Sequence, residues 1–205
     1  DMAPLCGVNK RACLRKYGGI PLNGEFCHET AIRLMTGAIV RQAAIYEYAA
    51  TPLFSYYADH YIRAYYRIRK GARRADKQLT QMGYIKYCPN CLHRETSENN
   101  METTCNFGED MKIGGPLWLG DLSDPEYVDA VIDDFENLPY LADSKAEAII
   151  KLVQGEHGYP VGFFIIDSFC KQVGIKSIAT DEALDAIKDA GYRVTRVHYD
   201  PRGFK

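Results

Sequence analysis

The chain has 205 residues, of which 46% are hydrophobic and 25% are charged, and its formal net charge at pH 7 is -2. This composition is typical of a folded globular protein with one full domain or two small ones, and it excludes a disordered chain. No apolar run approaches the roughly 18 to 20 residues that cross a bilayer, and no secretory signal pattern opens the chain, so we expect a cytoplasmic protein without a membrane partner.

The charges and cysteines are unevenly distributed. Acidic residues concentrate between Asp121 and Glu136, whereas the first third of the chain is basic, so a polyanionic partner is expected to dock on the first part. The seven cysteines are an odd number in a chain too long to need a disulfide framework. A reducing compartment fits this cysteine usage.

The first 50 residues predict a loop followed by a helix. Residues 1–24 are rich in glycine, proline and basic side chains, with one helical turn expected around residues 10–17. Residues 25–48 place apolar side chains three or four positions apart, as an amphipathic helix does. Pro52 is expected to end the connection to the next element.

The stretch 56–74 contains five tyrosines and six basic residues and predicts a strand running into a helix. Its alternation places His60 and Ile62 on a core face and Arg63 and Arg67 on the opposite face. Aromatic rings interleaved with guanidinium groups suit RNA, since rings stack on unpaired bases and cations meet phosphates. The alternative is a solvated strand whose arginine stems cover tyrosine rings.

Three cysteines in the middle of the chain predict a metal site. Cys88 and Cys91 are spaced to give two thiolates to one ion at a tight turn, and Cys105 follows a polar, aperiodic segment. His93 is the nearest candidate for the fourth ligand of a zinc knuckle at residues 88–105. Free thiols are the alternative; a redox dithiol fits less well, because no periodic helix follows the C-x-x-C motif.

Three adjacent residues of chemically active types, at positions 27–29, are expected to have a structural role and not a catalytic one. Cys27, His28 and Glu29 are adjacent on the predicted helix, where neighbouring side chains point about 100° apart. They therefore cannot form a nucleophile and base locally.

The second half predicts a glycine-bounded strand at 114–120 and then mostly helices. Short helices followed by a strand that turns near Arg202 are the order of a winged-helix-like module, with a helical bundle ending in a strand as the alternative. The expected helices cover 124–138, 144–154, 163–173 and 180–190, and the expected strand covers 192–199. No G-x-G-x-x-G or P-loop motif is present to hold a nucleotide cofactor. The predicted fold class is therefore mixed α/β, of the α+β kind.

Several motifs, taken together in this order, resemble the tRNA guanine-N2 dimethyltransferases, which use S-adenosylmethionine to make N2,N2-dimethylguanosine at position 26 of tRNA. The resemblance covers essentially the whole chain. The motifs are DMAPLCG at 1–7, ACLRKYGG at 12–19, CHETAIR at 27–33, ADHYIRAYYRI at 58–68, GARRAD at 71–76, MGYIKYCPNC at 82–91, GPLWLGDLSD at 115–124 and AGYRVTRVHYDPRGFK at 190–205.

The resemblance implies that this chain is the C-terminal portion of such an enzyme. Residues 1–50 would be the tail of a Rossmann-like methyltransferase domain, and residues 51–205 a C-terminal tRNA-binding domain. S-adenosylmethionine would be bound by an N-terminal core outside this chain, which leaves no catalytic residue here and predicts an inactive fragment. The expected partner is tRNA, and no protein partner is evident. The expected RNA contacts are basic residues, namely Arg63, Arg67, Arg69, Lys70, Arg73 and Arg74, with Arg202 and Lys205 as a second region.

A different class of function stays open from the sequence. The alternative is a stand-alone, zinc-stabilised RNA-binding module without enzymatic activity.

Overall fold

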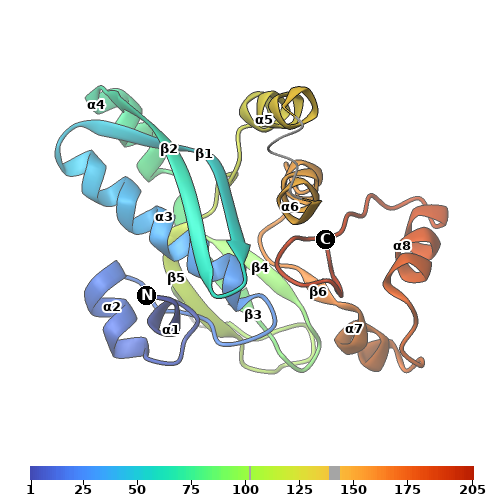
Figure 1. Ribbon diagram of the computed structural model, residues 1–205. Coiled ribbons are helices and arrows are strands. Elements are labelled where there is room, and N and C mark those ends of the chain that lie inside the picture. Colours follow the sequence, from blue (N-terminus) through green and yellow to red (C-terminus); the bar gives the residue numbers. More distant parts are fainter. Residues whose placement is uncertain (102, 139–143) are drawn as a thin grey trace.

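The computed structural model describes residues 1–101, 103–138 and 144–205, and it shows a mixed α/β protein (Figure 1). Within these residues the strands form three small antiparallel sheets, in the orders β1-β2, β4-β3-β5 and β6-β7. The elements in chain order are α1 (Met2–Leu5), α2 (Lys10–Tyr17), α3 (Cys27–Ile45), β1 (Tyr48–Ala58), β2 (Tyr61–Lys70), α4 (Ala72–Leu79), β3 (Met82–Tyr87), β4 (Arg94–Ser97), β5 (Lys112–Trp118), α5 (Pro125–Asn137), α6 (Ser144–Gly155), β6 (Phe164–Ile165), α7 (Ile166–Val173), α8 (Thr180–Asp189) and β7 (Gly203–Phe204).

The long helix α3 is the centre of the molecule and confirms the helix predicted at 25–48. It packs against both the β1-β2 hairpin and β5. Ile32 and Leu34 are fully buried on it. Gly37 lets the sheet come close, because a Cβ atom there would meet the Met82 side chain at 2.7 Å and the Trp118 amide at 3.3 Å. A larger residue at this position would push α3 away from the sheet.

The hairpin differs from the single strand predicted to begin near Tyr56. β1 already starts at Tyr48, and the chain reverses at Asp59, whose φ is +52°, before β2 begins. Pro52 lies inside β1 rather than ending an element. Proline has no backbone N–H to donate to the neighbouring strand. It is tolerated here because the pairing of β1 with β2 shifts register between Pro52 and Phe54, where the regular hydrogen-bond pattern is interrupted. His60 is therefore an exposed turn residue, and its predicted place in the core was wrong.

The three-stranded sheet has β3 at its centre. The predicted strands at 84–87 and 114–120 are confirmed as β3 and β5. Strand β4 was not predicted, because its sequence Arg-Glu-Thr-Ser has no apolar alternation and it is held by pairing with β3. The sheet carries the segment with Cys88, Cys91 and Cys105 at one end.

The last third contains the predicted helices at 124–138, 144–154 and 180–190, as α5, α6 and α8. The helix predicted at 163–173 starts three residues later, because Phe164 and Ile165 pair with β7. The strand predicted at 192–199 was wrong as a regular strand. Its middle instead pairs with the chain end, where Thr195 and Lys205 exchange two backbone hydrogen bonds of 2.9 Å.

One hydrophobic core joins the two halves of the described chain. It contains Phe26 and Ile32 from before the predicted domain boundary and Ile85 and Phe163 from after it. The boundary drawn between 1–50 and 51–205 falls inside β1, so the described residues show no division there. Within the same described part of the chain, no helix is long and apolar enough to span a bilayer.

Candidate nucleic-acid interface

The outer face of the hairpin carries the aromatic and basic side chains predicted for it. Along β2, exposure alternates from Tyr61 to Arg67, which confirms the period of two. Tyr61 and Tyr65 are 44% and 43% exposed. On the inner face, the Tyr66 hydroxyl is hydrogen bonded to the Thr36 hydroxyl of α3 at 2.9 Å. This inner contact holds β2 on α3, and the other face carries the half-exposed rings of Tyr61 and Tyr65.

The six predicted cations of this region are all exposed and follow β2 into α4: Arg63, Arg67, Arg69, Lys70, Arg73 and Arg74. We call these six residues the basic tract. The Arg63 guanidinium lies 5.3 Å from the centroid of the Tyr61 ring. Arg67 is 3.4 Å from the Asp124 carboxylate, and Arg74 donates a hydrogen bond of 3.0 Å to the Lys70 carbonyl. All six cations of the tract are thus exposed, and Arg67 is partly neutralised by Asp124.

A cationic hollow of about 310 Å³ lies where the hairpin meets α4. Arg69, Arg74 and Lys77 line it, and no carboxylate is among the described residues that do so. Gln78 anchors α4 to the hairpin, since its side chain accepts a 2.7 Å hydrogen bond from the Ala50 amide. Lys77 was not among the predicted site residues; its spacing of three from Arg74 puts both on one helical face, and that spacing could have indicated it.

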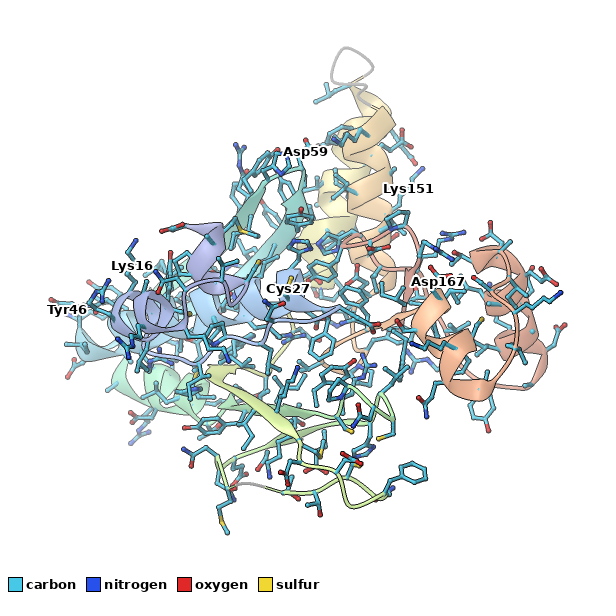
Figure 2. All side chains as sticks on the ribbon, turned by 90° about the horizontal axis from the view of Figure 1, so that it is seen from below. Lys16, Cys27, Tyr46, Asp59, Lys151 and Asp167 are labelled. Carbon is cyan, nitrogen blue, oxygen red and sulfur yellow. The ribbon has the colours of Figure 1, made fainter. Side chains whose placement is uncertain are left out.

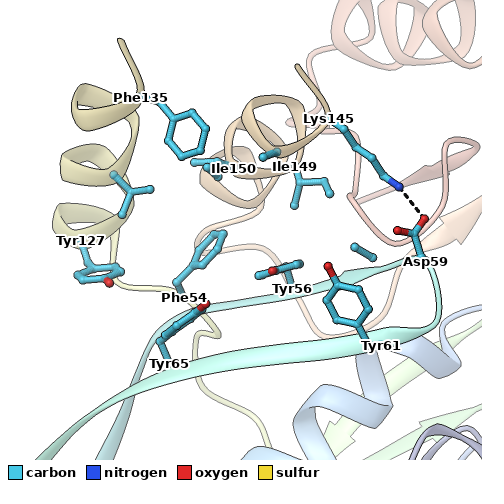
Figure 3. A pocket seen from close by; sticks show the side chains of 13 residues that line it. Phe54, Tyr56, Asp59, Tyr61, Tyr65, Tyr127, Phe135, Lys145, Ile149 and Ile150 are labelled. Carbon is cyan, nitrogen blue, oxygen red and sulfur yellow. Dashed lines mark hydrogen bonds and ion pairs between the residues drawn. The ribbon is translucent and has the colours of Figure 1, made fainter. Parts of the chain in front are cut away.

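An aromatic pocket of about 510 Å³ opens between the hairpin and the helices α5 and α6 (Figure 3). The hairpin gives four rings to it, from Phe54, Tyr56, Tyr61 and Tyr65. Tyr127, Phe135, Ile149 and Ile150 face these rings from α5 and α6. At its edge Lys145 and Asp59 form an ion pair of 2.6 Å. Walls of apolar and aromatic side chains with a few polar groups are typical of pockets that bind small molecules.

The second predicted contact region is arranged differently. The Lys205 side chain is only 4% exposed, and its ammonium lies 3.0 Å from the fully buried carboxylate of Glu29. The Arg202 guanidinium pairs with the Asp167 carboxylate. We correct the assignment of Lys205 as an RNA contact, because this buried ion pair withdraws its charge from the surface. Arg202 stays exposed but neutralised.

The three cysteines predicted to bind zinc come together. Their sulfur atoms lie within 4.8 Å of one another, with Cys88 and Cys105 buried and Cys91 partly exposed. The Cys88 amide donates a 2.9 Å hydrogen bond to the His93 carbonyl, which closes the turn. The His93 imidazole, the predicted fourth ligand, lies outside this group: its Nε2 atom is 3.7 Å from the Glu95 carboxylate. Three thiols converging in this way suit a zinc ion.

Comparison with known proteins places the chain in one family. Residues 1–205 match the family model described as N2,N2-dimethylguanosine tRNA methyltransferase. The chain is 36% identical over 211 residues to the tRNA (guanine(26)-N(2))-dimethyltransferase of Methanothermobacter thermautotrophicus, with 100% of this chain and 55% of that protein covered. The Pyrococcus horikoshii protein of the same name is 35% identical, and 52% of it is covered.

A solved structure agrees with these matches. It is a complex of Trm1 from Pyrococcus horikoshii with S-adenosyl-L-methionine, and it superposes with a TM-score of 0.86 at 34% identity, covering 100% of this chain and 53% of that one. The chain thus spans about half the length of its relatives. These coverages give the share of each relative that the chain matches. They do not support the prediction that this chain is the C-terminal portion of the enzyme. The chain belongs to the N2,N2-dimethylguanosine tRNA methyltransferase family.

Proposed function

We propose that this chain is the tRNA-binding part of an S-adenosylmethionine-dependent tRNA guanine-N2 dimethyltransferase that acts at guanine 26. The observation that carries the proposal is the basic tract running beside the aromatic pocket on one hairpin. Binding of RNA phosphates requires exposed cations that lie close together, and stacking of unpaired bases requires exposed aromatic rings. The hairpin carries both kinds of side chain. The reaction in this proposal is the one that the names of the family and of the relatives state.

The described residues do not fit S-adenosylmethionine. Nucleotide-type cofactors in doubly wound folds sit at the carboxyl ends of parallel strands, whereas every strand pair in the described residues is antiparallel. We therefore assign the cofactor to the remaining half of the protein; the solved relative is a complex with S-adenosyl-L-methionine. When bound there, it supplies the methyl groups.

The role of this chain is to hold and orient the RNA. Cations of the basic tract and of the cationic hollow contact phosphates and fix the position of the tRNA. The aromatic pocket is large enough for a nucleobase, and its rings stack on a base that has left its helix. Methylation of an amine inside a stem requires such a base to be exposed and placed in line with the methyl group.

The chain end supports a further part of this proposal. β6, the helices α7 and α8, the segment around Thr195 and then β7 follow one another as the elements of a winged-helix module do, with Arg202 at the tip of the last turn. We place the second RNA contact at this turn, carried by the exposed Arg202, whose pair with Asp167 a phosphate would have to replace, and without Lys205.

The test of the function uses tRNA and the whole protein that contains this chain. We expect the chain to bind an unmodified tRNA transcript with an affinity that falls steeply with salt, and the whole protein to convert guanosine in that transcript to N2,N2-dimethylguanosine, measured by mass spectrometry of the digested RNA. Binding by the whole protein without any methyl transfer would contradict the enzyme assignment. It would favour the stand-alone RNA-binding module.

Replacing Tyr61 and Tyr65 with leucine tests the aromatic pocket. Stacking on one base contributes about 1 to 3 kcal/mol, so we expect roughly tenfold or greater loss of tRNA affinity. The salt dependence of binding should stay the same, because no charge is removed. Tyr192→Leu is the matched control, since this ring is 71% exposed and lies outside the residues that line the pocket. An unchanged affinity in the double variant would remove the pocket from the proposal.

Zinc at Cys88, Cys91 and Cys105 remains a proposal that metal analysis can decide. We expect Cys88→Ser to lower the bound zinc by one equivalent per chain, because three thiolates form most of a tetrahedral site. His93→Gln should leave the metal content unchanged, since the imidazole faces Glu95. Cys170→Ala is the control. If His93→Gln removed the metal and Cys88→Ser did not, the proposed ligand set would be wrong.

A further inference from the structure

Cys6, Cys27 and His28 form a second group of soft ligands that the sequence did not predict. The Sγ atoms of the two cysteines and a ring nitrogen of His28 lie within 4.8 Å of one another, and all three residues are partly exposed. Cys6 ends α1, whereas Cys27 and His28 begin α3. Cys27 is labelled in Figure 2. The ligands thus come from two helices, and the fold brings Cys6 and Cys27 together although they are 21 residues apart in the sequence.

The two cysteines are held in place by the core. Leu5, immediately before Cys6, is 1% exposed, and Phe26, immediately before Cys27, is 2% exposed. The Cys27 amide also donates a 3.1 Å hydrogen bond to the Gly24 carbonyl. Because both neighbours are locked in the core, the closeness of the thiols is a property of the fold and not of a mobile surface.

The imidazole is held separately. The His28 ring stacks on the Tyr57 ring with centroids 3.9 Å apart and an angle of 9° between the planes. The Tyr57 backbone is itself anchored, since its amide donates a 3.1 Å hydrogen bond to Nε2 of His198. An imidazole that is fixed by a neighbour loses little freedom when it binds a metal ion, which favours binding.

We propose that Cys6, Cys27 and His28 bind a soft divalent metal ion, zinc above all, with three protein ligands and one open position. With zinc–sulfur bonds of about 2.3 Å and zinc–nitrogen bonds of about 2.0 to 2.1 Å, tetrahedral ligand atoms lie roughly 3.5 to 3.8 Å apart. The three atoms here lie within 4.8 Å of one another, so rotation of the side chains is enough to bring them onto one ion. Two thiolates neutralise the double charge of the ion. A disulfide would use only the two sulfurs and leave the imidazole without a role.

This site is independent of the proposed tRNA function. It uses none of the residues of the basic tract or the aromatic pocket. The presence of three protein ligands with a free fourth position is the pattern of sites that exchange a bound water or ligand, whereas closed sites have four.

The full chain is first reduced and freed of metal, and it is then titrated with Co²⁺. The experiment measures the number of Co²⁺ ions bound per chain and the sulfur-to-metal charge-transfer absorption. We expect Cys6→Ser, Cys27→Ser and His28→Asn each to remove one equivalent of Co²⁺ per chain and its absorption. Cys88→Ser should leave that equivalent in place, and the buried Cys170→Ala is the control. Circular dichroism checks that each variant folds.

A further variant keeps the test decisive if a serine substitution harms folding. His28→Cys offers a third thiolate in place of the imidazole and is expected to retain the equivalent with stronger charge-transfer absorption. The proposal is overturned if Cys27→Ser and His28→Asn, both folded, bind as much Co²⁺ as the unsubstituted chain. It is equally overturned if Cys6 and Cys27 form a disulfide on mild oxidation but the reduced chain binds no Co²⁺ at this group.

Discussion

Replacing Arg69, Lys70, Arg73 and Arg74 together with glutamine is expected to lower tRNA affinity by about 100-fold or more near physiological salt. All four side chains are exposed on the basic tract, and Arg69 and Arg74 also line the cationic hollow. Each phosphate contact releases a counterion, so the slope of log affinity against log salt should fall by about three. Filter binding or fluorescence anisotropy at several salt concentrations measures both quantities.

The matched control removes the same charge elsewhere. Lys10, Lys16, Lys112 and Lys151 are exposed lysines on α2, β5 and α6, and their replacement with glutamine should change affinity and slope much less. If both quadruple variants weakened binding equally, net charge alone would explain the effect. The assignment of the hairpin as the RNA-binding face would then be wrong.

Replacing Glu29 with alanine is expected to lower the free energy of unfolding by about 3 to 5 kcal/mol, because it leaves buried cations without their partner. One carboxylate oxygen of Glu29 accepts hydrogen bonds from Arg33 at 2.9 Å, Lys205 at 3.0 Å and the Gly162 amide at 3.1 Å. These contacts join α3 to the last residue of the chain and to the segment before β6. Urea unfolding followed by circular dichroism measures the loss.

An exposed ion pair supplies the control for this effect. Glu147 and Lys151 are 2.6 Å apart at positions i and i+4 of α6, with about half of each side chain exposed (44% and 52%). Glu147→Ala should cost less than about 1 kcal/mol, as surface pairs do. A Glu29→Ala variant that was no less stable than Glu147→Ala would contradict the structural role of the buried network.

The same carboxylate predicts a dependence of stability on pH. Burial alone would raise the pKa of Glu29, but the charges of Lys205 and Arg33 and the hydrogen bonds from Lys205 and Gly162 lower it to about 2, from an ordinary value of 4.5. Because the folded pKa is the lower one, the carboxylate stabilises the protein above about pH 4.5, and this stabilisation is lost as the pH falls toward 2. Unfolding free energies measured across this range should fall more steeply in the wild type than in Glu29→Gln. Parallel curves would show that another group controls acid unfolding.

Local patterns were enough to predict most of the helices, although α1 was not predicted. α3, α4, α5, α6 and α8 each carry an apolar stripe with a period near 3.6, which depends only on residues within the helix. The strands were harder, because a strand is stabilised by a partner distant in sequence. β4 has no pattern of its own, and β1 was obscured by Pro52, which is accommodated only because the register shifts beside it.

The sequence by itself determined the alternation of tyrosine and arginine along β2, the spacing of Cys88 and Cys91, and the family, because these are encoded in short runs of residues. Only the tertiary structure decided which charges and ligands meet. Lys205 has the sequence context of a surface cation, yet it is buried against Glu29, 176 residues away. Cys6 joins Cys27 and His28 while His93 turns toward Glu95. The physical reason is that an ion pair or a ligand cluster depends on distances across the folded core, and residues far apart in the chain carry no local signal of that distance.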